Sequence, residues 1–327
     1  MKNLSRPIAF VLCLAIIILM PLSYKITTGE QEFPITSPTH KCVLTLWNID
    51  VFEGGIGSRS DFLAQVSVDY KGQGVIVMVI SHTEESAQSS IKKGELPDMI
   101  SYGVGVDCIS GYAKSLPEIS FLGGEIGGKF YAYPWCAGGY FLIRKNQENR
   151  PIDRLFVSQN TYNIPFGGVY YGNLKAKEIL YKKPIDAYVD YLSGGSCDAL
   201  LGTQRDIKRL EQRGVEFYPT PIDGFSDLVQ YVSVLTSDKQ RYGESVRFLE
   251  FLISEKIQKK LNRIGMASVF YSVYSSGDAG IVDFSRISYT VSPFTDSEAI
   301  DKINSSVLSQ KITNSSLLDF KNVLKHL

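Results

Sequence analysis

The chain has 327 residues, of which 44% are hydrophobic and 21% are charged. This composition is that of a folded globular protein with enough length for two cores, and it argues against a disordered chain or a coiled coil. Lysine plus arginine and aspartate plus glutamate each number 34, so no net charge attracts nucleic acid or an anionic membrane, and a ligand must be recognised locally.

The first 23 residues have the pattern of an export segment. Lys2 and Arg6 precede an unbroken apolar run over residues 8–20, which suits a signal peptide and is shorter than the roughly 20 residues of a transmembrane helix. We expect residues 1–23 to be an export signal or an uncleaved anchor that places the protein outside the cytoplasmic membrane. The polar, proline-containing residues 24–40 are expected to form a linker.

From residue 41 the sequence alternates strand and helix patterns. Capping residues Ser58 and Thr83 begin two predicted helices, and strands are predicted at 43–47, 75–80 and 98–102. Such a β-α-β-α-β series predicts a parallel sheet with right-handed crossovers, with ligands bound outside the carboxyl ends of the strands. The loop after the first strand lacks the glycine patterns of nucleotide sites, so nucleotide binding is rejected.

The middle of the chain is less regular. Residues 129–144 predict two extended segments joined at glycines that could act as a hinge, whereas residues 145–173 predict no regular structure. Helical and strand character returns at 186–192 and 198–201. Thr203 then caps a helix that Gly214 ends, and its first turn could offer N–H groups to a ligand oxygen or serve capping alone.

The last third predicts a return to the first sheet. A strand at 216–218 and a loop at 219–227 lead to an apolar strand at 228–235. One amphipathic helix then continues to Gly265. The tail from residue 275 has only a modest helical pattern, near residues 297–308.

Neither a metal site nor a cofactor is predicted. Cys42, Cys108, Cys136 and Cys197 are far apart in the sequence and the chain has three histidines, which disfavours zinc. These four cysteines could form two disulfides or remain free thiols. The adjacent pair Tyr170 and Tyr171 resembles the tyrosines of ferric-iron binders, but no histidine or carboxylate motif accompanies it.

Four motifs in a fixed order resemble bacterial extracellular solute-binding proteins of ABC importers. They are a strand ending in Trp, a G-x-L-P-D step, a Y-A-x-P strand and an FLxFLxSxxxQ helix, within residues 43–269. The resemblance, closest to the sugar-binding branch, implies an α/β type II periplasmic-binding-protein-like fold with a cleft between two discontinuous lobes. Lobe 1 is then expected at 41–140 and 224–327, and lobe 2, short for a sugar-binding member, at 141–223.

The resemblance implies a monomeric, non-catalytic protein that captures a small polar ligand, most simply a sugar or oligosaccharide, for an ABC permease. A sensor that presents the ligand to a signalling partner, a ferric-iron binder and a polyamine binder remain alternatives. No hydrolase signature such as G-x-S-x-G is present. Aromatic and polar residues at predicted strand ends and at a helix start are the expected ligand contacts, although each could be structural. They are Trp47, Glu53, Tyr102, Trp135 and Tyr140 on one side of the cleft, and Gln204 and Arg205 on the other.

Overall fold

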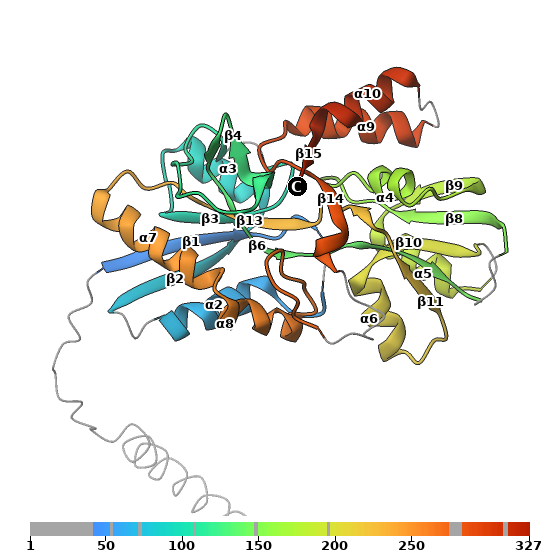
Figure 1. Cartoon of the computed structure of the whole chain (residues 1–327), viewed down its shortest axis with the longest axis horizontal. Helices are drawn as coiled ribbons and strands as arrows, with labels where there is room; N and C mark the ends of the chain where they lie inside the picture. Colours follow the sequence, from blue (N-terminus) through green and yellow to red (C-terminus); the bar gives the residue numbers. More distant parts are fainter. Residues whose placement is uncertain are drawn as a thin grey trace, which may run out of the picture. The chain divides into compact units, whose positions relative to one another are not determined.

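The computed structural model of the chain describes residues 42–52, 55–70, 74–106, 109–146, 150–194, 197–274, 283–309 and 313–327. Residues Cys42–Leu327 belong to one compact unit, shown in Figure 1. The predictions made for residues 1–40, for Glu53 and for Cys108 lie outside the described residues. Within these ranges, every helix is too short or too polar to span a bilayer.

The first five-stranded sheet contains the predicted β-α-β-α-β series, and its strand order is β2-β1-β3-β13-β6. Strand β1 is parallel to β2 and β3, whereas β13 is antiparallel to β3 and β6. Both predicted helix caps are confirmed, because Ser58 Oγ accepts the Asp61 amide and Thr83 Oγ1 accepts the Ser86 amide. The elements are β1 (Cys42–Ile49), α2 (Arg59–Tyr70), β2 (Val75–His82), α3 (Glu84–Lys92), β3 (Met99–Tyr102), β6 (Tyr133–Ala137) and β13 (Val229–Val234).

The second five-stranded sheet has the order β11-β7-β10-β8-β9. Strand β10 is antiparallel to β7 and parallel to β8, which is parallel to β9. The predicted cap Thr203 forms a capping box with Asp206, and Gly214 adopts a left-handed φ of 64° after the helix. The elements are β7 (Tyr140–Arg144), β8 (Ile152–Ser158), α4 (Phe166–Tyr171), β9 (Ala176–Lys182), α5 (Pro184–Leu192), β10 (Ala199–Thr203), α6 (Gln204–Gln212) and β11 (Tyr218–Pro221).

The two sheets confirm the expected two-lobed α/β class, and they lie on the left and right of Figure 1. The chain leaves the first sheet after β6 and enters the second at β7, through Gly138 and Gly139. Gly138 is needed there because a Cβ atom would lie 2.5 Å from Nε2 of Gln204. The lobe boundaries 41–140 with 224–327, and 141–223, stay a proposal.

Three sequence predictions of local structure were wrong. Residues 145–173 contain β8 and α4, because β8 is fixed by its neighbours β9 and β10 and not by local pattern. The strand expected at 216–218 is β11 at Tyr218–Pro221, and β12 (Gly224–Phe225) interrupts the expected loop. The long helix is divided, because Ser254 Oγ bonds the Phe251 carbonyl and ends its first part. The parts are α7 (Lys239–Leu252), α8 (Glu255–Gln258) and η4 (Lys259–Ile264).

The C-terminal residues add two helices and the strands β14 and β15, which join β12 in a three-stranded sheet of order β12-β14-β15. Helix α9 confirms the helical pattern predicted at 297–308. Phe320 of α10 is fully buried, and its ring meets Phe166 of α4 at 5.3 Å and Phe225 at 5.8 Å. The remaining elements are η3 (Leu122–Gly124), β4 (Glu125–Ile126), β5 (Lys129–Phe130), η5 (Phe284–Arg286), β14 (Ile287–Val291), α9 (Ser297–Leu308), α10 (Asn314–Val323) and β15 (Leu324–His326).

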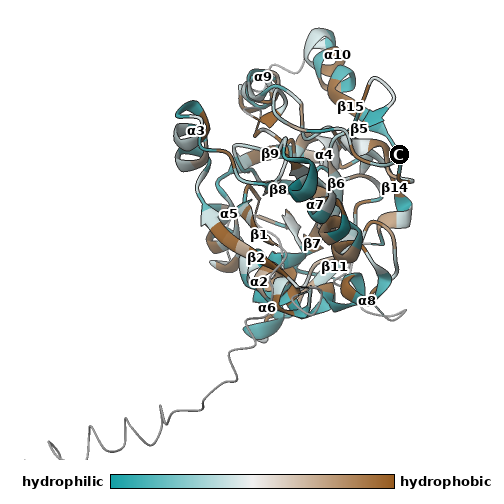
Figure 2. Ribbon diagram, turned by 90° about the vertical axis from the view of Figure 1, so that its left-hand side faces the viewer, coloured by the Kyte–Doolittle hydropathy of each residue, from teal (hydrophilic) through white to brown (hydrophobic). Residues whose placement is uncertain are grey.

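Aromatic residues are mostly core residues. Tyr171 stacks on Phe225 at 5.8 Å and on Tyr289 at 4.9 Å, in the cluster that also holds Phe320. In Figure 2 strand β2 is largely hydrophobic, whereas α7 carries both hydrophilic and hydrophobic residues. Cys42, Cys136 and Cys197 are free thiols.

Candidate functional site

Two adjoining cavities open at the carboxyl ends of β1 and β2. The first chamber has a volume of about 410 Å³ and the second about 550 Å³. The two chambers share four lining residues, so they form one continuous site. These residues are Asp50, Val51, Ser58 and Tyr162. The site therefore lies where the parallel topology predicts a ligand, outside the strand ends of the first sheet.

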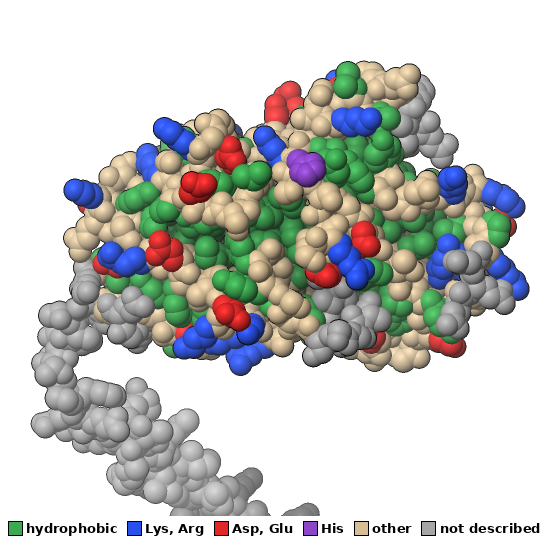
Figure 3. Space-filling view, viewed as in Figure 1, with side chains coloured by type: hydrophobic (Ala, Val, Ile, Leu, Met, Phe, Trp, Pro, Cys, Tyr) green, Lys and Arg blue, Asp and Glu red, His purple; other side chains and the backbone are tan. Residues whose placement is uncertain are grey.

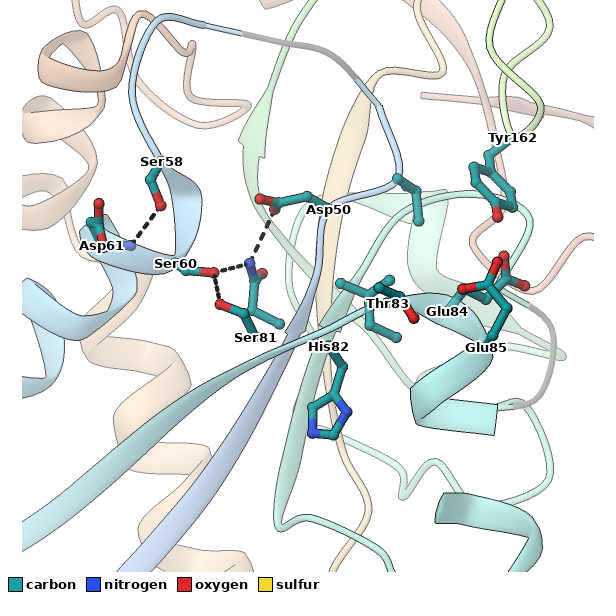
Figure 4. Close-up of a pocket in the computed structure, with 13 residues that line it drawn as sticks. Asp50, Ser58, Ser60, Asp61, Ser81, His82, Thr83, Glu84, Glu85 and Tyr162 are labelled. Atoms are coloured by element: carbon teal, nitrogen blue, oxygen red, sulfur yellow. Dashed lines mark hydrogen bonds between the residues drawn. The ribbon is translucent and has the colours of Figure 1, made fainter. Parts of the chain in front are cut away.

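A hydrogen-bonded group of small polar side chains forms the floor of the first chamber (Figure 4). Asn48 at the end of β1 donates through Nδ2 to Asp50 Oδ1 at 3.0 Å and to Ser60 Oγ at 2.8 Å. Ser81 at the end of β2 donates to the same Ser60 oxygen at 2.7 Å. This network joins β1, β2 and the first turn of α2, so it fixes the positions of its hydroxyl groups before a ligand arrives.

Arg59 organises the loop between β1 and α2. Its guanidinium pairs with Asp50 at 2.9 Å, donates to the Phe52 carbonyl at 2.5 Å and lies 4.2 Å from the centre of the Phe52 ring. The Arg59 side chain is only 5% exposed, and a buried guanidinium needs such partners. Arg59 is thus committed to protein contacts, although it lines the second chamber.

The first chamber is rich in carboxylates. Asp61 lies in the first turn of α2, and Glu84 and Glu85 lie in the first turn of α3. Hydrogen bonds from its own backbone amide and from Thr83 lower the pKa of Glu85, which favours its charged form. These anionic groups occupy the electropositive ends of both helices, so the chamber is unfavourable for a second anion.

Three residues that follow strands of the second sheet also contribute to the site. Asn160 Nδ2 donates to the Val51 carbonyl at 2.6 Å. Burial raises the pKa of Tyr162, and its hydrogen bond to Glu84 raises it further. Figure 4 shows the Tyr162 hydroxyl directed toward Glu84 and Glu85. Arg205, in the first turn of α6, lines the second chamber. The pocket is therefore lined by residues that follow strands of both five-stranded sheets.

Of the six predicted contacts that lie in the described residues, only Arg205 lines either chamber. The Trp47 ring is 8% exposed and meets the His82 ring at 4.3 Å. Trp135 is fully buried and donates from Nε1 to Ser101 Oγ at 3.0 Å. Both tryptophans therefore have contacts within the protein that account for their positions.

The other predicted residues also make internal contacts. The Tyr102 hydroxyl lies 2.7 Å from Ser233 Oγ, and the Tyr140 hydroxyl donates to Asp227 Oδ1 at 2.7 Å. Gln204 accepts the Gly139 amide at 3.1 Å and donates to Met266 Sδ at 3.4 Å. A ligand role for Trp47, Tyr102, Trp135, Tyr140 and Gln204 stays a prediction that this geometry does not favour.

Sequence reasoning missed most of the lining residues. Asn48, Asp50 and Ser81 follow strands whose ends were predicted, so the change from apolar to polar residues was an available signal. Asn160 and Tyr162 lie in a segment for which no regular structure was predicted, and no local pattern indicates them. Among the described residues, no group of three or more His, Cys, Asp or Glu side chains is arranged to hold a metal ion.

The fold is that of the type II periplasmic binding proteins. The chain superposes on the maltose-maltodextrin binding protein of Alicyclobacillus acidocaldarius with a TM-score of 0.54 and 14% identity, covering 86% of this chain and 99% of that one. A substrate binding domain assigned to a molybdenum ABC transporter from Clostridium difficile covers 70% of this chain and 99% of its own, with 15% identity and a TM-score of 0.46. No family model and no curated protein matches the sequence.

Proposed function

We propose that this chain is an exported solute-binding protein that captures a small polar ligand and delivers it to an ABC permease. The observation that carries the proposal is a pocket with walls from both lobes of a type II binding-protein fold. Positive and negative side chains are interspersed on the face shown in Figure 3, which fits a small-molecule partner better than nucleic acid.

We propose a neutral polyol, such as a sugar, as the ligand class, and an amine as the second candidate. Carboxylates accept hydrogen bonds only, and serine hydroxyls both donate and accept, so Asp61, Ser60 and Ser81 complement ligand hydroxyl groups. The carboxylates beside the α2 and α3 termini disfavour an oxyanion and also suit an ammonium group.

The hydrogen-bond partners of Ser60 and Ser81 favour a binding role for the pocket over a catalytic one. Ser60 accepts hydrogen bonds from Ser81 and from Asn48, and neither of these is a general base. The one described histidine of the site, His82, contacts Ser86 Oγ at 3.1 Å and the Trp47 ring. This arrangement does not activate a serine nucleophile.

A thermal-shift screen of sugars, polyols, polyamines, amino acids and oxyanions tests the proposal. A ligand at about 100 times its dissociation constant stabilises a protein by roughly 2.7 kcal/mol. We expect a sugar or an amine to raise the melting temperature of the wild type and to have less effect on Asp61→Asn and Ser81→Ala. Stabilisation by molybdate or another oxyanion alone would refute the proposed ligand class.

Ser67→Ala is the matched control for these variants. The Ser67 hydroxyl bonds the Ala64 carbonyl on α2, away from both chambers, so this variant should respond to the ligand as the wild type does. An equal loss of response in Ser67→Ala would show that binding occurs elsewhere.

A further inference from the structure

Strand β2 forms one edge of the first five-stranded sheet, and among the described residues it pairs only with β1. It is eight residues long, Val75–His82, and contains no Asp, Glu, Lys, Arg or Pro. Its register with β1 is continuous over its whole length, so no bulge bends the edge away. A long, regular and uncharged edge strand is a template for pairing with a further strand.

The other edges of the two large sheets are protected in ways that β2 is not. Strand β9 carries the charged residues Lys177, Glu178 and Lys182, and β11 carries Pro219 and Pro221. Strand β6 is buried along its whole length. Charges, prolines and coverage are the usual means by which proteins keep a sheet edge from pairing, so β2 is the exception among these four edges.

One face of β2 also exposes apolar side chains. Met78 is 50% exposed and Ile80 is 38% exposed. Ile76 lies on the same face because side chains alternate along a strand, and Val43 of β1, which is 40% exposed, stands beside it in the register. We call these four residues the β2 face. The open edge of the sheet therefore borders an open apolar surface.

The sequence of β2 is symmetrical about Met78, since residues 76–80 are Ile-Val-Met-Val-Ile and read the same in both directions. When two copies of the strand pair antiparallel about a two-fold axis at Met78, like side chains stand opposite each other. Apolar and β-branched cross-strand pairs of this kind stabilise a sheet. The pairs are Met78 with Met78, Ile76 with Ile80, and Val77 with Val79.

The charges of the chain also favour a second copy as the partner of this edge. Lysine plus arginine and aspartate plus glutamate both number 34, so two copies do not repel each other through their net charge. Strand β2 itself brings no Asp, Glu, Lys or Arg to the contact. A two-fold pairing uses the edge of both copies, so the association closes at two chains.

We propose that two copies of this chain form a symmetrical dimer by antiparallel pairing of their β2 strands about Met78. The dimer differs from the monomer that the family resemblance implies. An interface built on one strand edge is small, so we expect a reversible dimer with a dissociation constant on the order of micromolar. Ser81 and His82 of β2 line the first chamber, so each copy lies beside the pocket of the other.

Sedimentation equilibrium of the full chain in a mild detergent, over roughly 1–100 µM, tests the dimer. Met78→Lys should weaken dimerisation by about tenfold or more, because the two-fold axis places the two lysines directly opposite each other. Val68→Lys is the matched control, because Val68 is 61% exposed on α2 and lies outside the β2 face. It should dimerise as the wild type does.

Disulfide cross-linking of the full chain tests the register. In the dimer the two Cα atoms of residue 78 lie within about 5.5 Å of each other, so Met78→Cys should form a covalent dimer under mild oxidation. The two copies of residue 76 lie more than about 13 Å apart, which is too far for a disulfide. Ile76→Cys and the exposed control Val68→Cys should therefore give no more covalent dimer than the wild type, whose own cysteines set the background.

Three results would overturn the proposal: a wild-type chain that stays monomeric at the highest concentration, a Met78→Lys variant that dimerises as the wild type does, or equal cross-linking at residues 68, 76 and 78. A cross-link from Met78→Cys to a different protein, with no covalent dimer, would also overturn it. These measurements contain no ligand, so their outcome is independent of the solute-binding proposal.

Discussion

Gly138 offers a sharp test of how the lobes are joined. An alanine Cβ at this position would lie 2.5 Å from Nε2 and 3.0 Å from Oε1 of Gln204, too close for either atom to stay. The Gln204 amide must then move, and it loses its bonds to the Gly139 amide and to Met266 Sδ. The Gly139 N–H becomes a buried donor without a partner, which costs about 1–3 kcal/mol.

Urea unfolding of Gly138→Ala should therefore show a loss of about 1–3 kcal/mol in the free energy of unfolding. Gln204→Ala should lose a similar amount. Gly138→Ala in the Gln204→Ala background should be nearly neutral, because the clash has been removed. Gly243→Ala is the control: its Cβ would meet nothing within 4 Å on helix α7, so it should stabilise by about 0.5–1 kcal/mol. Additive losses for Gly138→Ala and Gln204→Ala would refute the reasoning.

Three further predictions concern stability. Arg59→Met should lower the free energy of unfolding by about 1–3 kcal/mol in urea titration, because the Phe52 carbonyl loses its donor and the partly exposed Asp50 loses its ion pair; a neutral result would show that the Arg59 bonds contribute nothing net. Burial opposes the charge of Asp98, but hydrogen bonds from Arg241 and Thr45 outweigh it and lower the pKa of Asp98 in the folded protein. The charged carboxylate therefore stabilises the fold above the pKa of an unfolded aspartate, about 4. This stabilisation is lost as the pH falls through the pKa of the folded state. The stability difference between wild type and Asp98→Asn should accordingly shrink in acid, and a difference that is constant with pH would contradict this. Phe320→Ala should lower the free energy of unfolding by about 3–5 kcal/mol, because Phe320 is fully buried. Leu318 is 59% exposed on the same helix, so Leu318→Ala should change the free energy of unfolding by less than about 0.5 kcal/mol. Equal effects would show that Phe320 is not a core residue.

The sequence predicted those helices and strands that are determined by residues close together in the chain. The helix caps are of this kind, because a capping hydroxyl bonds an amide only two or three residues further on. Such bonds are made by Ser58, Thr83 and Thr203. By contrast, β8 depends on parallel partners that are distant in sequence, and its charged residues Asp153 and Arg154 obscured its pattern. Strands β1, β2 and β3 also pair in parallel, but they contain no Asp, Glu, Lys or Arg, so the charges within β8 are what hid this strand.

The position of the site was predictable, but its composition was only partly so. The carboxyl ends of β1 and β2 were predicted as the ligand edge, both chambers open there, and Asn48 and Ser81 follow from that topology. Aromatic rings were assigned to the pocket because they stand near strand ends. Which face of a strand a ring occupies depends on register and packing, and Tyr102 and Trp135 lie on buried faces.

Burial is expected to make the three described thiols, those of Cys42, Cys136 and Cys197, poorly reactive. Only the thiolate attacks oxidants and disulfides, and burial raises the pKa of Cys42, Cys136 and Cys197, that of Cys197 to about 11. At neutral pH roughly one Cys197 side chain in ten thousand is then ionised, since each pKa unit is a factor of ten. In an oxidising compartment the fold therefore keeps Cys42, Cys136 and Cys197 protonated, and mixed disulfides at these three residues should form chiefly when the fold opens.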